Sequence, residues 1–165
     1  MTLTYPDGVF DPRLRGHTST VAHQVNTAET RGGGLAGAVA AFAPYGDVFR
    51  GRQSGRDGLV PPAVRATPGS VRVDRPPGNG LTSGQLTFVA MYGQIYGGGP
   101  GRGTDDAAHR EHYFAHCLDA IVPALPRLES IAFPKWIGCE IAGGDWDKYE
   151  RMIRQFAGLH PHLQV

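Results

Sequence analysis

The sequence predicts an α/β fold, in the form of a three-layer α/β/α sandwich with a mixed central sheet. The main observation is that apolar, strand-like segments at residues 18–25, at 85–91 and from residue 130 are each followed by a glycine-rich turn and then a helical pattern. The predicted helices cover residues 35–42, 105–125 and 145–157. The 165 residues are about the size of one domain, so we expect a single domain over residues 1–165.

Shorter elements complete the predicted order. We expect an edge strand at 1–5, a short helical turn at 47–52, a surface strand at 70–73 and a last short strand at 160–165. Residues 53–84 are rich in Gly, Pro, Arg and Ser. They are too weakly apolar to form a core of their own, so we expect a long excursion around the strand at 70–73.

Composition argues against several classes of protein. A net charge of +1 gives no reason to expect attraction to nucleic acid or to anionic membranes. The sequence has neither a long apolar run nor a basic segment followed by an apolar one at its start, so we expect no membrane span and no signal peptide. Cys117 and Cys139 are too few for a disulfide framework. We therefore expect a monomer in the cytoplasm or another reducing intracellular compartment.

A glycine-rich turn at residues 138–144, the second glycine loop, lies between an apolar run and an amphipathic helix. Backbone N–H groups at the start of a helix have no internal partner and lie at the positive end of its dipole, so such a loop suits a phosphate. Glycines allow the main chain to approach the ligand closely. Asp145 has a structural interpretation as well, because aspartate is a common cap for a following helix.

Residues 31–34, the first glycine loop, have the same context near the other end of the chain. A strand-like run precedes them, Asn26 follows where that strand ends, and a helix of small residues comes after them. In open α/β sheets ligands bind at the carboxyl ends of strands. The two glycine loops are therefore expected to hold one diphosphate between them, which predicts a nucleotide-sized site.

Taken together, these segments resemble the macrodomain family. The residues that carry the resemblance are Ala22-His23-Gln24-Val25-Asn26, Arg31-Gly32-Gly33-Gly34-Leu35-Ala36, Ala90-Met91-Tyr92-Gly93-Gln94 and Ile137-Gly138-Cys139-Glu140-Ile141-Ala142-Gly143-Gly144-Asp145-Trp146. Within that family the chain is most similar to the branch of the terminal ADP-ribose protein glycohydrolase and the yeast-type ADP-ribose 1″-phosphate phosphatase. The resemblance implies a cleft for ADP-ribose or an ADP-ribosylated substrate, and we expect no cofactor.

The resemblance also implies which residues bind the ligand. Asn26 would lie near the distal ribose, beside Gly32, Gly33, Gly34, Leu35 and Ala36, and the diphosphate would be wrapped by Gly138, Cys139, Ile141, Ala142, Gly143 and Gly144. Gln94 stands at the end of the central strand. Asp11, or alternatively Asp7, would hold the adenine amino group, and Tyr96 or Tyr92 would stack on a ring.

The catalytic residues of the glycohydrolase transfer less well. The resemblance to the glycohydrolase implies covalent catalysis by a lysine, assisted by an aspartate of the second loop. The matching positions in this chain are Gln94 and Ala142. A glutamine amide cannot form a Schiff base, and neither lysine of the chain, Lys135 or Lys148, lies on that strand. The phosphatase-like relatives share a histidine that His23 matches, so His23 is the candidate acid/base.

Glu140 replaces a glycine of the family pattern and is a second catalytic candidate. Its carboxylate would repel a diphosphate unless it points away or meets Arg31 or Arg102, and toward the distal ribose it would position a water. The sequence thus favours a hydrolase acting on the distal ribose, with Asn26, His23 and Glu140 at the reaction centre. The alternative is a non-catalytic module that recognises ADP-ribosylated targets.

Two further patterns are set aside. His109, His112 and His116 fall on one face of the long helix next to Cys117, but no flanking cluster completes four zinc ligands, so we expect no metal. Neither glycine loop has the spaced Gly-x-Gly-x-x-Gly pattern of a Rossmann dinucleotide site.

Overall fold

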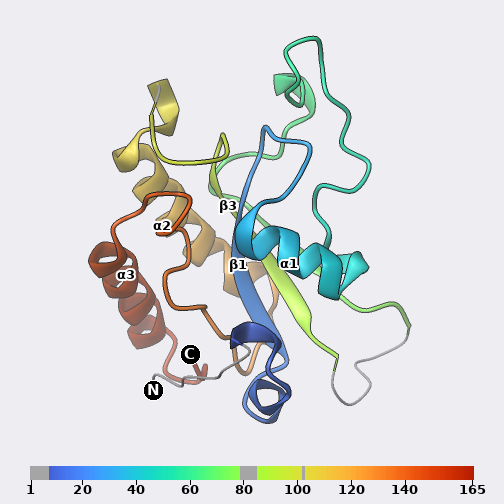
Figure 1. Ribbon diagram of the computed structural model, residues 1–165. Helices are drawn as coiled ribbons and strands as arrows, with labels where there is room; N and C mark the ends of the chain where they lie inside the picture. The colour runs from blue at the N-terminus through green and yellow to red at the C-terminus, as the bar shows by residue number, and fades with distance from the viewer. Residues whose placement is uncertain (1–7, 79–84, 102) are drawn as a thin grey trace.

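A mixed three-stranded sheet lies at the centre of the protein, whose computed structural model describes residues 8–78, 85–101 and 103–165 (Figure 1). Its strands are β1 (Thr20–Asn26), β2 (Val71–Asp74) and β3 (Thr87–Gln94), in the spatial order β1-β3-β2. β3 runs parallel to β1 and antiparallel to β2, so the predicted mixed sheet is confirmed. The predicted edge strand at residues 1–5 lies outside the described residues, as do Asp7 and Arg102.

Helices cover both faces of this sheet. α1 (Gly34–Phe42) lies on one face, and α2 (Ala107–Ala124) and α3 (Trp146–Leu159) lie together on the other (Figure 1). The predicted three-layer α/β/α sandwich is therefore confirmed. Short 3-10 helices lie at Gly8–Phe10, Pro12–Gly16, Pro44–Gly46, Pro62–Val64 and Gly103–Asp105. None of the helices in the described ranges is long and apolar enough to cross a bilayer.

β1 and β3 are buried along almost their whole length because both faces of the sheet are covered there. Every residue of β3 is buried. Ala22 and Val89 pack on the side of α2 and α3, in one cluster with Phe114. On the opposite face Val21 and Phe88 pack against α1. This double burial removes the polar–apolar alternation that would otherwise show which side chain faces which layer.

The three helices begin in two different ways. The carboxylate of Asp106 accepts a hydrogen bond from the His109 N–H, and that of Asp145 accepts from Asp147 and Lys148, so α2 and α3 have side-chain caps. α1 follows Gly33, which offers no side-chain cap. The first N–H groups of α1 therefore stay available to another acceptor.

Three of the shorter elements differ from their prediction. Residues 47–52 form turns instead of a helix, because the Asp47 carboxylate accepts the Phe49 N–H at 2.9 Å and closes the chain locally. The expected strands from residue 130 and at 160–165 shrink to single bridges, between Val21 and Ala132 and between Ser130 and Gln164.

The described part of the Gly/Pro/Arg-rich excursion, residues 53–78, leaves α1 and returns to the sheet through β2. It is tied to the segment before the first glycine loop by one hydrogen bond, from the Val60 N–H to the Ala28 carbonyl at 2.7 Å. Figure 1 shows most of it as an extended loop beside the strands.

His23 lies in the core beneath α1 and predicts an acid-sensitive fold. Its side chain is fully buried next to Phe88, and in the described part of the chain neither ring nitrogen has a hydrogen-bond partner. This burial lowers the pKa of His23 from 6.5 to about 4. The imidazole is then neutral in the folded protein but protonated in the unfolded chain below pH 6.5, so stability is lost as the pH falls from 6.5 towards 4.

We expect about 3 kcal/mol of unfolding free energy to be lost through His23 over that pH range. Urea unfolding at a series of pH values measures it, and His23→Leu should flatten this part of the profile. His112→Leu, a control at an exposed site on α2, should not. An unchanged acid dependence in His23→Leu would contradict the assignment.

Candidate functional site

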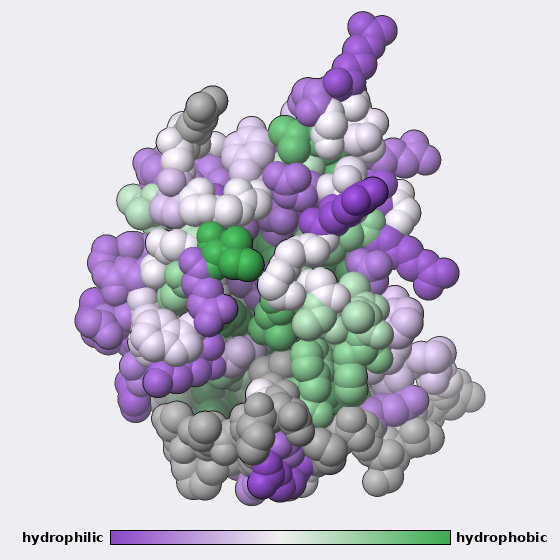
Figure 2. All heavy atoms as spheres, viewed as in Figure 1, coloured by the Kyte–Doolittle hydropathy of each residue, from purple (hydrophilic) through white to green (hydrophobic). Residues whose placement is uncertain are grey.

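A cleft of about 440 Å³ opens at the carboxyl ends of β1 and β3, between the two glycine loops. Its lining residues are Gln24, Val25, Asn26, Glu29, Arg31, Gly32, Gly33, Gly34, Leu35, Ala36, Phe49, Gln94, Gly97, Gly98, Pro134, Lys135, Trp136, Ile137, Gly138, Cys139, Glu140, Ile141 and Ala142. Figure 2 shows this face with pale and green residues at its middle, over α1 and the loop before α3, and purple residues around them. The volume is within the usual range for a small-molecule site.

The wall that precedes α1 is held by polar contacts at the end of β1. The Asn26 side-chain oxygen accepts the Glu29 N–H at 2.8 Å, which turns the chain out of the strand. Arg52 donates to the backbone carbonyls of Asn26 and Glu29, at 3.1 and 2.8 Å, and its guanidinium lies 4.4 Å from the centre of the Phe49 ring. Arg52 thus fixes this wall from behind.

The first glycine loop ends at the uncapped start of α1. Gly34 has a φ of +51°, which glycine adopts without strain. A Cβ at this position would lie 3.2 Å from the Ile141 Cδ1 of the second glycine loop, so the two loops meet over the cleft. The free N–H groups of the first turn of α1 therefore start beside the opposite loop.

The second glycine loop is a tight turn with unused donors. Its internal hydrogen bonds run from the N–H groups of Cys139, Gly143 and Gly144 to the carbonyls of residues 136, 140 and 138. Within the described chain, the N–H groups of residues 140, 141 and 142 take part in no hydrogen bond. Consecutive free N–H groups in a turn form an anion-binding concavity. Both walls of the cleft thus offer backbone donors.

The floor of the cleft is a relay of two amides. Gln24 Nε2 donates to Gln94 Oε1 at 2.7 Å, and Gln94 Nε2 donates to the Tyr96 carbonyl at 2.9 Å. The relay commits both polar ends of Gln94, the residue at the position of the covalent lysine. Gln94 therefore serves the architecture of the floor.

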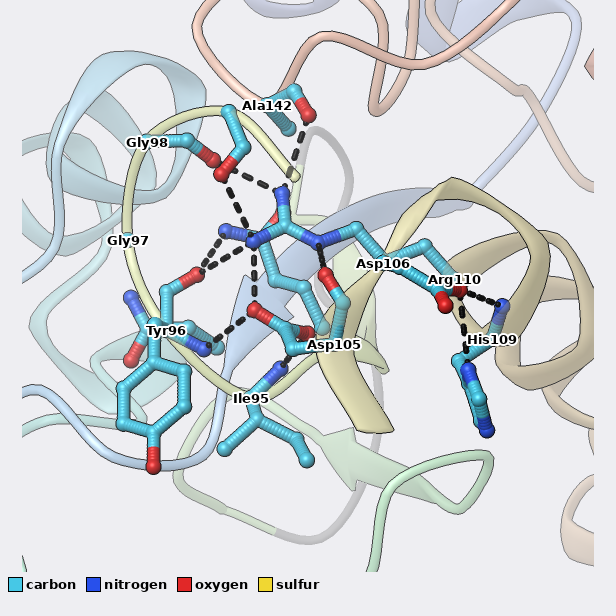
Figure 3. A network of polar contacts seen from close by, with 12 residues as sticks. Ile95, Tyr96, Gly97, Gly98, Asp105, Asp106, His109, Arg110 and Ala142 are labelled. Atoms are coloured by element: carbon cyan, nitrogen blue, oxygen red, sulfur yellow. Dashed lines mark hydrogen bonds and ion pairs between the residues drawn. The ribbon is translucent and has the colours of Figure 1, made fainter. Parts of the chain in front are cut away.

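A buried ion pair lies behind the cleft, between Arg110 of α2 and Asp105 (Figure 3). Both side chains are 2% exposed, and Arg110 Nη2 lies 2.5 Å from Asp105 Oδ2. The guanidinium also donates to the backbone carbonyls of residues 96, 98, 99, 105 and 142. The Asp105 carboxylate in turn accepts the N–H groups of Ile95 and Tyr96. All five N–H groups of the guanidinium are thereby used.

Two residues of the wall, Lys135 and Trp136, were not among the predicted site residues. Trp136 is 47% exposed, and it is the one non-glycine residue with positive φ in the described ranges, at 68°. Lys135 Nζ lies 5.3 Å from the centre of its ring. In the sequence alone, a buried apolar run and an exposed cleft wall look alike, because the backbone turn that separates them is not visible there.

Charged side chains of both signs line the cleft: Glu29 and Arg31 on one wall, and Lys135 and Glu140 on the other. Glu140 is exposed, and no hydrogen bond to it is present in the described part of the chain beyond the turn made by its carbonyl. Its carboxylate is therefore available to a water or to a ligand.

Several predicted site residues lie away from the cleft. His23 is enclosed beneath α1, and this position argues against the acid/base role expected for it, because a buried imidazole cannot exchange a proton with a ligand in the cleft. Asp11 is buried and caps a 3-10 helix, where it pairs with Arg13 at 2.7 Å. Neither Tyr92 nor Tyr96 lines the cleft.

The predicted residues of the loops fare differently. Those that the structure brings together at the cleft are Asn26, Gly32, Gly33, Gly34, Leu35, Ala36, Gln94, Gly138, Cys139, Glu140, Ile141 and Ala142. Gly143 and Gly144 are not part of the lining; a Cβ would lie 2.8 Å from Pro100 Cδ at Gly143 and 3.1 Å from the Tyr149 ring at Gly144. Sequence order alone does not separate the residues of such a turn that line a cleft from those that do not.

The thiol of Cys139 is a poor nucleophile. Burial raises its pKa to about 11, with Asp145 adding to the shift, so the thiol stays protonated at neutral pH. His109, His112 and His116 lie along α2. Over the described ranges no group of three or more His, Cys, Asp or Glu side chains is placed to hold a metal ion.

Comparison with solved structures decides the fold. The chain is similar to the macrodomain of Mycobacterium tuberculosis DarG, with a TM-score of 0.64 and 19% sequence identity, over 99% of this chain and 94% of the other. The chain has the macrodomain fold. It is also similar to a protein of unknown function from Bacteroides thetaiotaomicron, with a TM-score of 0.52 and 18% identity, over 88% and 83% of the two chains. No family model and no curated protein matches the sequence.

In this structure the glycine at position 138 is required by its surroundings. Its φ is +71°, and a Cβ there would overlap Gln24 Oε1 and lie 2.7 Å from the Tyr149 ring. We expect Gly138→Ala to lower the unfolding free energy by about 3 kcal/mol.

Gly33→Ala is the matched control in the other loop, because a Cβ at Gly33 meets nothing within 4 Å. It should cost less than about 1 kcal/mol. Chemical unfolding of the two variants measures the difference, and equal costs would contradict the packing described for Gly138.

Proposed function

We propose that the cleft binds ADP-ribose, either free or attached to another molecule. The observation that carries the proposal is the pair of facing backbone donor sets: the uncapped start of α1 and the free N–H groups of residues 140–142. A diphosphate has acceptor oxygens on both phosphates, so it can accept hydrogen bonds from both walls at once. The macrodomain fold and the resemblance of the glycine loops support ADP-ribose as the nucleotide.

The lining suggests an orientation for the ligand. Gln94, Gly97 and Gly98 extend from β3 on one side of the end of β1. Residues 134–136 extend from the segment that is bridged to β1 on its other side. We propose that the distal ribose lies toward Asn26, whose side-chain NH2 group can donate to a hydroxyl group. The base then lies toward Trp136, whose exposed ring offers it an apolar surface.

Hydrolysis at the distal ribose is a second candidate function, favoured by Glu140. Its exposed carboxylate lines the cleft on the loop assigned to the diphosphate. A carboxylate beside the ribose can accept a proton from an attacking water, while Asn26 holds the sugar. The substrate would be ADP-ribose 1″-phosphate or an ADP-ribosyl ester, and His23 takes no part.

The binding proposal predicts a measurable ADP-ribose complex. Calorimetry should give a dissociation constant in the micromolar range, roughly −8 kcal/mol. Adenosine, which lacks the diphosphate, should bind far more weakly. Trp136 and Trp146 are the only tryptophans of the chain, so Trp136 is the single emitter in Trp146→Phe. Its fluorescence should change on titration with ADP-ribose. The absence of both a heat of binding and a fluorescence change at millimolar ADP-ribose would overturn the proposal.

Glu140→Gln separates binding from turnover. Removing the negative charge beside a diphosphate should strengthen ADP-ribose binding by about twofold to tenfold. If Glu140 activates water, the same change should lower the release of phosphate or ADP-ribose by at least about a hundredfold. Both substrates are incubated with each protein, and Glu150→Gln on α3 serves as a control. Turnover that is unaffected in Glu140→Gln removes the catalytic role, and wild-type binding without turnover leaves a binding module.

A further inference from the structure

We infer that Arg110 is a positioning residue of the cleft: it holds the second glycine loop in the shape that binds the ligand, without touching the ligand. Arg110 is 2% exposed and is absent from the cleft lining. Any effect on binding must therefore act through the groups that it holds. The inference rests on the proposed ADP-ribose site and concerns how that site is maintained.

One nitrogen of Arg110 joins two loops. Nη1 donates to the Gly98 carbonyl at 2.7 Å and to the Ala142 carbonyl at 2.9 Å (Figure 3). Gly98 follows β3, whereas Ala142 belongs to the second glycine loop, and both line the cleft. Since Nη1 carries two N–H groups in a fixed plane, it sets the separation of these two carbonyls.

The contact to Ala142 lies at the functional part of the second glycine loop. Residues 140–142 carry the N–H groups that are free of hydrogen bonds in the described structure. Anchoring the carbonyl of Ala142 to a buried cation restrains the peptide units on which these donors lie. A loop with free donors and few internal bonds would otherwise have to be ordered by the ligand, at a cost in affinity.

Arg110 also reaches the floor of the cleft. Its Nη2 donates to the Tyr96 carbonyl at 3.3 Å, and the same carbonyl accepts Gln94 Nε2 at 2.9 Å. Gln94 in turn accepts from Gln24. The Arg110 guanidinium therefore fixes the second glycine loop directly, and it fixes the floor of the cleft through the Tyr96 carbonyl.

Lysine at position 110 would keep the charge and lose the geometry. An ammonium group can pair with Asp105, but it has three donors at one point and cannot span carbonyls that lie on both sides of a planar fork. The ion pair with Asp105 would be retained, while most of the contacts to the backbone carbonyls would be lost. Arg110→Lys thus tests these carbonyl contacts separately from the charge.

The experiment compares Arg110→Lys with wild type and with Arg154→Lys. Arg154 makes an exposed pair with Glu150 on α3, so this matched control makes the same substitution away from the cleft. ADP-ribose affinity is measured by calorimetry, and backbone hydrogen exchange is measured on the unliganded proteins. For Arg110→Lys we expect about tenfold weaker binding, with faster exchange at residues 138–144 and at 96–101 and unchanged exchange in α3. Arg154→Lys should match wild type in both.

A folded Arg110→Lys protein with wild-type affinity and wild-type exchange in these loops would overturn the inference. If wild type binds no ADP-ribose, the proposed function fails, whereas the exchange data on the unliganded protein still decide the positioning role. If Arg110→Lys does not fold, Asp105→Asn perturbs the same ion pair from its other side. The same two readouts then decide.

Discussion

The loops around the cleft of this macrodomain fold are held in place by one buried ion pair, between Arg110 and Asp105. Removing two charges from water costs several kcal/mol per ion, and burial is tolerated only where hydrogen bonds satisfy both partners. Here the guanidinium and the carboxylate are both saturated by backbone groups of the loops around the cleft. Replacing a buried ion pair with well-packed hydrophobic residues is often neutral or stabilising. What the ion pair adds is a set of directional bonds to segments that have no regular structure of their own.

The second glycine loop is also shaped from the core side. Tyr149 of α3 is fully buried and stacked on Phe114 with ring centres 4.2 Å apart, and its ring lies against Gly138 and Gly144. The loop can pass over this ring only where side chains are absent. Glycines are therefore needed in this turn for two separate reasons. Some leave room for Tyr149 behind the loop, and others leave the front of the cleft open to a ligand.

The glycine loops and the helices could be predicted from the sequence, because each depends on local chemistry: glycine runs, helical periodicity and aspartate caps. The face of the sheet on which the His23 side chain lies could not be predicted. Strands that are buried on both faces lose the polar–apolar alternation that assigns a side chain to a layer. Arg110 escaped prediction for a related reason. An arginine inside a helical pattern is normally solvated, and only tertiary contacts reveal that this one is enclosed. Trp136 depends on a backbone turn with positive φ, which its neighbours in sequence do not specify.

The hydrogen bonds, protonation states and positions of the polar side chains limit the chemistry that the cleft can perform. Gln94 is bonded at both ends of its amide, the Cys139 thiol is protonated at neutral pH, and His23 lies outside the cleft. Lys135 lines the cleft, but on the opposite side of β1 from Gln94. A Schiff base at a ribose bound near Asn26 would therefore lack an amine on that side of the cleft. If water attacks there instead, the carboxylates of Glu29 and Glu140 line the cleft and can accept its proton.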